Sequence, residues 1–262
     1  MTRIVPLLDG HISFDPRLFP AVREAPEEAA RLLGTTTLPD QIDVPVWYYL
    51  AKTAQGACLV DTGSGELFGG LPGRLPTTLA HHGVAPEDIR RIWLTHLHGD
   101  HCGGLITEAG APAFSNARIA LPEAEAEHWF DAHHEGVGAD IARDAKSALA
   151  PYDGRIDRIA PGTQVDGATA LNAHGHTPGH TAWLLPDHAV IAAGDIVHLP
   201  PLQLRHPDWS SDWDTDLHAA AEARKTLLLH ARKEQLMLLT GHGGPLGPES
   251  LAASIPFETE PT

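Results

Sequence analysis

Residues 95–101 of the chain read Thr-His-Leu-His-Gly-Asp-His, directly after an apolar segment typical of a buried strand. His96 and His98 are two positions apart, so in extended backbone their side chains point to the same side and both imidazoles can reach one metal ion. A glycine then lets the chain turn, which places Asp100 and His101 at the start of the next element. There they can face a second metal ion or the water bound to the first. This cluster of side chains predicts a metal site.

Three further candidates occupy comparable places in the sequence. His176, Asp195 and His242 each follow the end of an apolar segment that reads as a strand, and each has a glycine beside it. In layered α/β folds, sites gather beyond the carboxyl ends of strands, so separate strand ends can deliver their ligands to one edge of the molecule. The candidate metal ligands are His96, His98, Asp100, His101, His176, Asp195 and His242.

The composition is that of an acidic globular protein. The formal net charge of −16 argues against nucleic acid as a partner, because binding it requires Lys and Arg to displace the counterions of phosphates. The same charge argues against anionic membrane surfaces, and no apolar run approaches the ~18 residues of a membrane-spanning helix. The first residues lack the basic and apolar regions of a secretory signal, so we expect a cytoplasmic protein. Histidine is unusually frequent, with 18 residues, as many as Lys and Arg together.

Apolar segments bounded by Gly or Pro alternate with helical patterns in both halves of the chain, and no low-complexity linker separates the halves. This order predicts a single domain over residues 1–262, with layered sheets and helices packed outside them. The expected strands cover 4–8, 44–51, 57–60, 91–95, 117–121, 168–173, 181–185, 189–193 and 235–240. The expected helices cover 26–33, 75–82, 122–150 (in one or two pieces) and 215–231.

The pattern of motifs resembles the metallo-β-lactamase superfamily of hydrolases. The motifs are 96–101, His176 in Gly-His-Thr-Pro-Gly-His, Asp195 in Ala-Gly-Asp, His242 in Thr-Gly-His-Gly-Gly and Asp61 in Val-Asp-Thr-Gly. This resemblance implies an αββα sandwich, in which two facing mixed β-sheets are flanked by helices. Within the superfamily the chain is most similar to the branch of methyl parathion hydrolase and acyl-homoserine lactonases. Within this branch, the segments 67–69, 73–75, 86–87, 95–105 and 174–181 resemble methyl parathion hydrolase.

The resemblance also implies a centre of two zinc ions, with iron, manganese or cobalt as alternatives. One ion would be held by His96, His98 and His176, and the other by Asp100, His101 and His242, with Asp195 bridging the two. Mixed imidazole and carboxylate ligands are typical of hydrolytic zinc sites. A hydroxide shared by the two ions would attack the carbonyl of an ester or a lactone in a small-molecule substrate.

Several further residues are expected to assist the reaction. Asp100 can orient the hydroxide, and Asp61 and His180 can receive the second N–H groups of metal-bound imidazoles. Asp61 can instead be a turn residue, and His180 a buried histidine bonded to backbone. His198 lies three positions after Asp195 and can donate a proton to the leaving group, or it can be a loop histidine that faces solvent.

The loop that follows Asp195 is expected to form a wall of the substrate pocket. Trp209 and His206 are the candidates for this wall, because aromatic side chains give a pocket an apolar lining. The alternative is that the tryptophans of this loop pack against the outer helix. By resemblance, the protein is expected to form a homodimer.

The sequence alone is compatible with other activities. A phosphotriesterase or a true β-lactamase would keep the same centre and change the substrate. An iron-dependent oxidoreductase of the same fold is less favoured, because no flavin-binding domain follows residue 245 and every ligand position of a two-metal hydrolase is filled. RNA processing is disfavoured by the acidic charge. A protein that binds metal without catalysis would need a blocked pocket.

Overall fold

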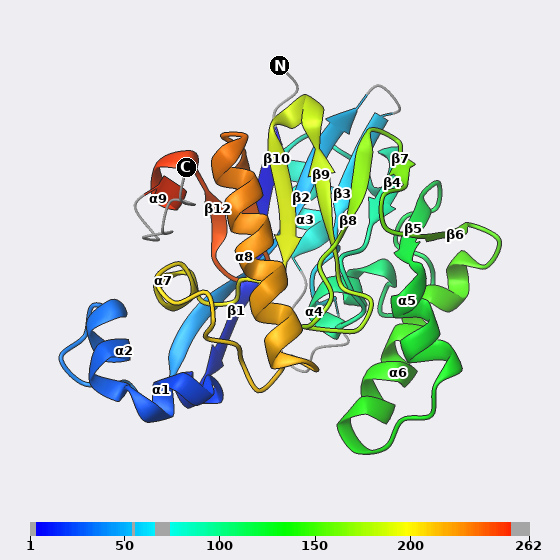
Figure 1. The fold of residues 1–262 in the computed structure, drawn as a ribbon. Coiled ribbons are helices and arrows are strands. Elements are labelled where there is room, and N and C mark those ends of the chain that lie inside the picture. Colours follow the sequence, from blue (N-terminus) through cyan, green and yellow to red (C-terminus); the bar gives the residue numbers. More distant parts are fainter. Residues whose placement is uncertain (1–3, 54–55, 66–73, 253–262) are drawn as a thin grey trace.

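Two six-stranded sheets form the centre of the computed structural model, which describes residues 4–53, 56–65 and 74–252 (Figure 1). The first sheet has the order β1-β2-β3-β4-β5-β6 and the second the order β12-β11-β10-β9-β8-β7. Both are mixed. In the first, β1, β2 and β3 pair antiparallel and β3, β4, β5 and β6 parallel; in the second, only β10 and β11 pair parallel among the described strands. The strands are β1 (Val5–Phe14), β2 (Ile42–Thr53), β3 (Gly56–Val60), β4 (Ile89–Trp93), β5 (Arg118–Pro122), β6 (Ile156–Ile159), β7 (Gln164–Val165), β8 (Ala168–Asn172), β9 (Thr181–Leu185), β10 (Val190–Gly194), β11 (Met237–Thr240) and β12 (Gly244–Leu246).

The sheets pack face to face because their strands alternate apolar side chains between two buried faces. In β10, Val190 and Ala192 point into the core between the sheets, whereas Ile191 points to the outer face. Trp93 of β4 and Trp183 of β9 meet across that core, with ring centroids 6.4 Å apart. Because alternate side chains of a strand point to opposite faces, each sheet also carries apolar side chains on its outer face. These must be buried by another element.

Helices supply these outer covers. The helix α8 packs its Leu227, Leu228 and Ala231 on the second sheet, in front of β10 in Figure 1, whereas α3 and α6 cover the first. The α-helices are α1 (Pro20–Glu24), α2 (Pro26–Leu32), α3 (Leu75–His81), α4 (Gly99–Cys102), α5 (Glu123–Ala126), α6 (Gly136–Leu149), α7 (Pro200–Gln203), α8 (Leu217–Lys233) and α9 (Pro248–Ala252). Short helical turns are η1 (Pro16–Leu18), η2 (Pro86–Asp88), η3 (Gly103–Leu105), η4 (Glu127–Asp131, a π-helical turn), η5 (Ala150–Tyr152) and η6 (Pro186–His188).

This architecture confirms the predicted αββα sandwich of two mixed sheets between helices. The first strand is longer than expected, and the short strands β6, β7 and β12 were not predicted. The expected helix over 122–150 is divided into α5, η4 and α6. The segment 67–69 and Gly73, which contributed to the predicted branch, lie outside the described residues. Among the described helices, none is both long and apolar enough to cross a membrane.

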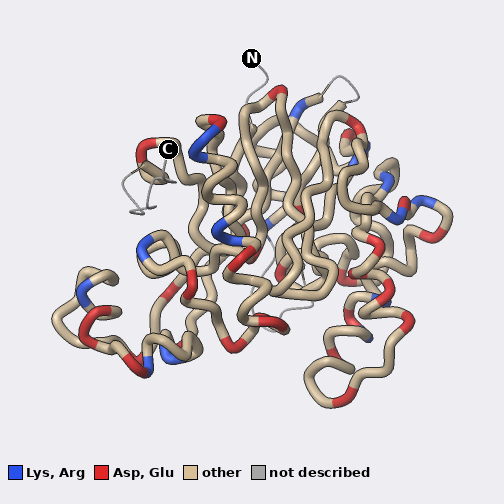
Figure 2. Tube along the Cα trace, in the orientation of Figure 1, with Lys and Arg blue, Asp and Glu red and all other residues tan. Residues whose placement is uncertain are grey.

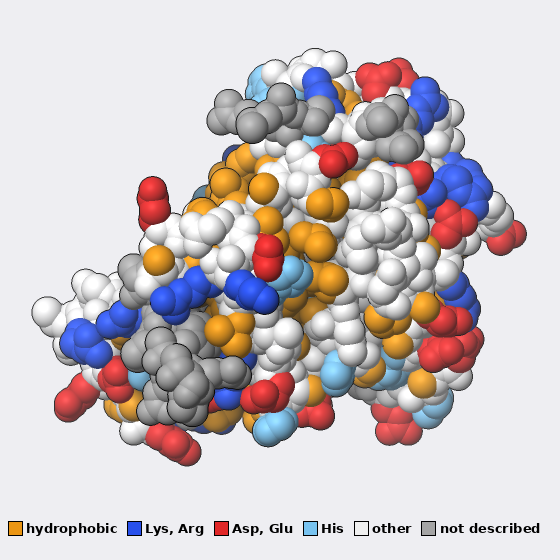
Figure 3. Space-filling view, turned by 45° about the horizontal axis from the view of Figure 1, so that its top comes forward, with side chains coloured by type: hydrophobic (Ala, Val, Ile, Leu, Met, Phe, Trp, Pro, Cys, Tyr) orange, Lys and Arg blue, Asp and Glu red, His pale blue; other side chains and the backbone are white. Residues whose placement is uncertain are grey.

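Charged side chains lie mainly on the helices and loops around the sheets. Figure 2 shows Asp and Glu spread over these peripheral segments, with Lys and Arg interspersed and the central strands almost free of both. The space-filling view shows hydrophobic side chains in the middle of one face and charged side chains mostly around them (Figure 3). The excess of acidic residues is thus distributed over the surface of the molecule.

A cluster of ion pairs joins neighbouring strands of the first sheet. Arg91 of β4 is only 8% exposed, and its Nη1 lies 2.6 Å from Oδ2 of Asp157 in β6. Nη2 of Arg118 lies 2.5 Å from the other oxygen of the same carboxylate. Hydrogen bonds from Arg118 and Arg91 outweigh partial burial and lower the pKa of Asp157 from 3.8 to about 2.

We predict that Asp157→Asn destabilises the fold in a pH-dependent way. A carboxylate with a lowered pKa in the folded state stabilises the protein above its ordinary pKa and loses this effect as the pH falls through the folded value. The loss of unfolding free energy should be on the order of 1 kcal/mol from pH 8 to pH 5 and should shrink between pH 4 and pH 2. Urea denaturation at each pH measures it, with Asp153→Asn as the exposed control. An equal loss at pH 3 and pH 8 would contradict this account.

Candidate metal centre and active site

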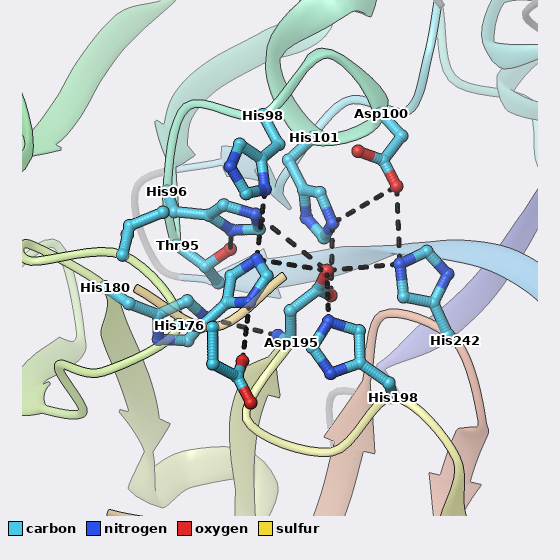
Figure 4. A network of polar contacts seen from close by, with 12 residues as sticks. Thr95, His96, His98, Asp100, His101, His176, His180, Asp195, His198 and His242 are labelled. Atoms are coloured by element: carbon cyan, nitrogen blue, oxygen red, sulfur yellow. Dashed lines mark hydrogen bonds and ion pairs between the residues drawn. The ribbon is translucent and has the colours of Figure 1, made fainter. Parts of the chain in front are cut away.

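All of the predicted metal ligands lie together at one edge of the two sheets, the lower edge in Figure 1 (Figure 4). His96 and His98 follow β4, and Asp100 and His101 belong to α4. From the second sheet, His176 follows β8, Asp195 follows β10 directly, and His242 comes two residues after β11. The strand ends therefore deliver all of these side chains to one place, as the sequence indicated.

Asp195 lies in the middle of the cluster. Its Oδ1 lies 3.1 Å from Nε2 of His101, and its Oδ2 lies 3.1 Å from Nε2 of His242. The same Oδ2 lies 3.7 Å from Nε2 of His176 and 3.9 Å from Nε2 of His96. One carboxylate thus faces histidines of both predicted ligand groups, which is the position that a bridging ligand requires.

The first ligand group consists of three imidazoles. His96, His98 and His176 place ligand nitrogens within 4.8 Å of one another, and Nε2 of His176 lies 3.0 Å from Nδ1 of His98. The other ring nitrogen of His176 lies 3.0 Å from Oδ1 of Asp214, a buried residue just before α8. A carboxylate at this position fixes the orientation of the ring, as is usual for metal-binding histidines. Asp214 was not predicted from the sequence.

The second ligand group combines carboxylates with imidazoles. Asp100, His101, Asp195 and His242 are all buried, and their ligand atoms also lie within 4.8 Å of one another. Nε2 of His242 lies 3.3 Å from Oδ2 of Asp100, and Nε2 of His101 lies 3.7 Å from the same oxygen. This group can therefore offer both nitrogen and oxygen to one cation.

Asp61 supports the cluster from the end of β3. It accepts hydrogen bonds from the backbone N–H and the hydroxyl of Thr95, both at 2.8 Å, and its Oδ2 lies 2.8 Å from Nδ1 of His101. Its backbone is left-handed, with φ +59°, so both readings of this residue, turn residue and partner of an imidazole, describe the structure.

His180 has the contacts of the alternative reading, a buried histidine bonded to backbone. Its Nε2 accepts a hydrogen bond from the backbone N–H of Asp195 at 3.1 Å, so it contacts the backbone of a predicted ligand. This contact anchors the chain where it leaves β10. A Cβ on Gly194 would approach Nε2 of His180 to 2.7 Å, so glycine is needed beside Asp195.

Burial and the facing aspartates divide the histidines into two electrostatic classes. Burial lowers the pKa of His96 well below its ordinary value and that of His98 to about 3, so these imidazoles are neutral. Burial also opposes protonation of His101 and His242, but the facing aspartates outweigh it. They raise the pKa of His101 well above its ordinary value and that of His242 to about 10. The carboxylate side of the cluster therefore attracts positive charge.

The donor atoms fit bound cations. Nε2 of His96 is buried without a hydrogen-bond partner, and Nε2 of His101 and Oδ1 of Asp195 lie 3.1 Å apart but form no contact of hydrogen-bond geometry, whereas buried polar groups are normally hydrogen-bonded or bound to metal. Gly241 keeps the space between them open, because a Cβ there would lie 2.3 Å from Oδ1 of Asp195 and 3.0 Å from Cε1 of His101. Imidazole and carboxylate together are a donor set for zinc, cobalt, iron or manganese.

His198 is buried at the cluster and is not a solvent-facing loop residue. It is 1% exposed, and its Nε2 lies 3.4 Å from Oδ2 of Asp195. Together with His176 and Asp195 it forms a further group of donors within 4.8 Å of one another. The side chain of Gln203, which was not predicted, accepts the backbone N–H groups of His198 and Leu199 at 2.7 and 3.0 Å. The loop that carries His198 is therefore held in place.

A cavity of about 620 Å³ opens over the cluster. His98, Asp100, His176, Asp195, His198 and His242 line its floor. Its apolar walls come from Ile12, Trp129, Val137, Ile141 and Trp213.

The predicted pocket residues Trp209 and His206 are not among the lining residues. Their rings stack on each other with centroids 4.4 Å apart, and His206 lies 3.0 Å from Glu28 of α2, so Trp213 takes the expected place in the wall. Trp129 was missed because it lies 33 positions after His96, in a stretch that reads as a surface helix.

Comparison with known proteins agrees with this geometry. The family model of the metallo-β-lactamase superfamily matches residues 42–242. An N-acyl homoserine lactonase of a Bacillus species is 33% identical over 174 residues, which are 58% of this chain and 62% of that protein. A second N-acyl homoserine lactonase, from Bacillus cereus, is also 33% identical, over 58% of this chain and 62% of the relative. The chain thus spans about six-tenths of the length of these curated relatives.

Solved structures match over almost the whole chain. A hydrolase of the β-lactamase superfamily named AbOPH superposes with a TM-score of 0.82 and 26% identity, over 97% of this chain and 87% of that one. AidC, a dizinc quorum-quenching lactonase solved with the product N-hexanoyl-L-homoserine, gives a TM-score of 0.81 over 97% and 88% of the two chains; at 24% identity this likeness shows the fold alone. By its sheets, its cluster of histidines and aspartates and the matching family model, the chain belongs to the metallo-β-lactamase superfamily.

Proposed function

We propose that the protein is a dinuclear metal-dependent hydrolase of esters and lactones, with zinc as its metal. The observation that carries the proposal is the position of Asp195 between two groups of buried donors at the floor of an open, partly apolar cavity. The relatives named N-acyl homoserine lactonase support a lactone or ester as substrate.

The two ligand groups would hold one cation each. His96, His98 and His176 would bind the first, Asp100, His101 and His242 the second, and Asp195 both. Two bound cations supply a water of lowered pKa as nucleophile and Lewis-acid polarisation of the substrate carbonyl.

The chain's own side chains supply orientation and a proton. The Asp100 carboxylate is buried at the floor of the cavity, where it can accept a hydrogen bond from the nucleophile and orient it. His198 reaches the same floor and can donate a proton to the leaving oxygen of the ester. The apolar walls can hold the unreacting part of the substrate and exclude water from the reacting bond.

The lining of the cavity favours an uncharged substrate. The described residues that line it include aspartates, histidines and apolar side chains but no Lys or Arg. A β-lactam antibiotic carries a carboxylate, and apart from the proposed metal ions the described lining offers no cationic side chain to bind it. A neutral ester or lactone needs no such partner, and this is why we place it ahead of a β-lactam.

A substrate panel tests the proposal. We expect zinc-supplemented protein to hydrolyse lactones and aryl esters with the highest kcat/KM, phosphotriesters more slowly, and a cephalosporin least. The measurement is initial rates on all four classes with the same preparation, with protein stripped by a chelator as the control. Highest kcat/KM on the cephalosporin, or no metal-dependent hydrolysis of any ester or lactone, would overturn it.

A second prediction concerns the bridge. Asp195→Ala should lower the occupancy of both metal sites, because one carboxylate serves both groups. His101→Ala is the matched variant and should lose mainly one metal, because its imidazole belongs to one group only. Metal per chain after gel filtration, measured by elemental analysis, checks both. Retention of two metals by Asp195→Ala, or equal loss of both metals in His101→Ala, would contradict the proposed division of ligands.

A third prediction concerns His198. His198→Phe should leave metal content unchanged and lower kcat by about 10²-fold or more for esters with a poor leaving group, because general acid catalysis contributes at least this much. For activated aryl esters the decrease should be small, since their leaving oxygen needs no proton. Steady-state rates across a series of leaving groups measure the effect. Unchanged kcat at both ends of the series would show that His198 does not donate the proton.

A further inference from the structure

Glu125 is a completely buried carboxylate outside the metal cluster. It lies in α5, directly behind the two loops that carry three of the proposed ligands, and its side chain is 0% exposed. Its neighbours of the same type in sequence, Glu123 and Glu127, are exposed. A buried charge is costly unless hydrogen bonds replace the lost water, so its partners decide what it does.

The carboxylate accepts four hydrogen bonds from three different segments. Oε1 accepts the backbone N–H of Leu97 at 3.0 Å and the indole N–H of Trp129 at 2.7 Å. Oε2 accepts the hydroxyl of Thr177 at 2.7 Å and the backbone N–H of Gly179 at 3.1 Å. All four donors are neutral, so the carboxylate has no counter-charge among these hydrogen-bond partners.

The identity of the donors connects Glu125 to the proposed first metal site. Leu97 lies between the ligands His96 and His98, and Thr177 directly follows the ligand His176. The two loops come from different sheets, and Glu125 bonds both of them.

The backbone packing at the same place is equally close. A Cβ on Gly179 would approach the backbone nitrogen of Glu125 to 2.0 Å and its Cα to 2.4 Å. The loop that carries His176 can therefore lie against the start of α5 only with glycine at this position. Close packing and hydrogen bonding fix the same contact independently of each other.

We propose that Glu125 is a positioning residue that holds the His96–His98 loop and the His176 loop together as one tridentate metal site. Through Trp129, which lines the cavity, it also fixes one wall of the substrate pocket. The inference rests on one part of the proposed function, namely that His96, His98 and His176 bind a metal ion.

Glu125→Gln is the most selective variant. An amide nitrogen facing Leu97 and Trp129 would leave two obligate donors without an acceptor, so the amide should turn toward Thr177 and Gly179. The Thr177 hydroxyl can rotate and accept a hydrogen bond, but the backbone N–H of Gly179 then loses its acceptor. The variant should thus loosen the His176 loop. Removing such outer partners typically lowers metal affinity by about 10–100-fold, and we expect about tenfold for the first site.

Zinc retention measures this effect without reference to catalysis. Wild type, Glu125→Gln and the exposed control Glu123→Gln are loaded with zinc and equilibrated with a graded chelator, and zinc per chain is determined. In a His242→Ala background, Glu125→Gln should still weaken retention. In a His176→Ala background, it should have no further effect, because the site it supports is already broken. Retention by Glu125→Gln equal to that by Glu123→Gln would overturn the proposal.

A second variant keeps the test valid if Glu125→Gln fails to fold by circular dichroism. Thr177→Val removes one donor with little change of shape and should lower zinc retention several-fold; wild-type retention would overturn the proposal. The two proposals fail separately. If the wild type binds zinc but hydrolyses no ester or lactone, the proposed function is wrong. The comparison of zinc retention between Glu125→Gln and Glu123→Gln still tests the role of Glu125. Full hydrolysis with unchanged zinc retention in the variants overturns only the role of Glu125.

Discussion

The structure depends on one electrostatic constraint, the burial of several carboxylates among histidines at the edge of two sheets. Asp61, Asp100 and Asp195 are each less than 7% exposed, and no Lys or Arg is paired with them in the described chain. Several like charges buried this close to one another repel, so the set requires nearby positive charge. The facing aspartates raise the pKa of His101 and His242, which shows that this place favours positive charge, and divalent cations between the same atoms would supply that charge.

The fold meets this constraint by ending strands of both sheets at the same edge. Where these strands end, the backbone adopts the left-handed conformation, with positive φ at Asp61 and at Gly194 beside Asp195. Buried polar side chains also hold the loops that carry the cluster: Asp214 orients His176, Gln203 holds the chain at His198, and we propose that Glu125 joins the loops of the first ligand group. The geometry of the cluster thus relies on residues that would not contact a metal.

The sequence predicted the parts that repeat a local pattern. Apolar segments bounded by Gly or Pro located most strands, and histidines and aspartates just after such segments indicated the proposed ligands, because each signal lies within a few residues. Glu125 and Asp214 escaped prediction, since the ligand-bearing loops that they bond are 28 to 54 and 38 residues away. Glu125 stands between two exposed glutamates that look the same in sequence. Trp209 was chosen for the pocket wall and Trp213 was not, because side-chain direction in an irregular loop depends on packing.

The most direct test of this account is anomalous diffraction from crystals of zinc-supplemented wild-type protein, recorded on both sides of the zinc absorption edge. The account predicts two anomalous peaks per chain. One should lie among His96, His98 and His176, the other among Asp100, His101 and His242, with the Asp195 carboxylate between them. A single peak, or no peak within the cluster, would contradict the claim that Asp195 bridges two metal ions.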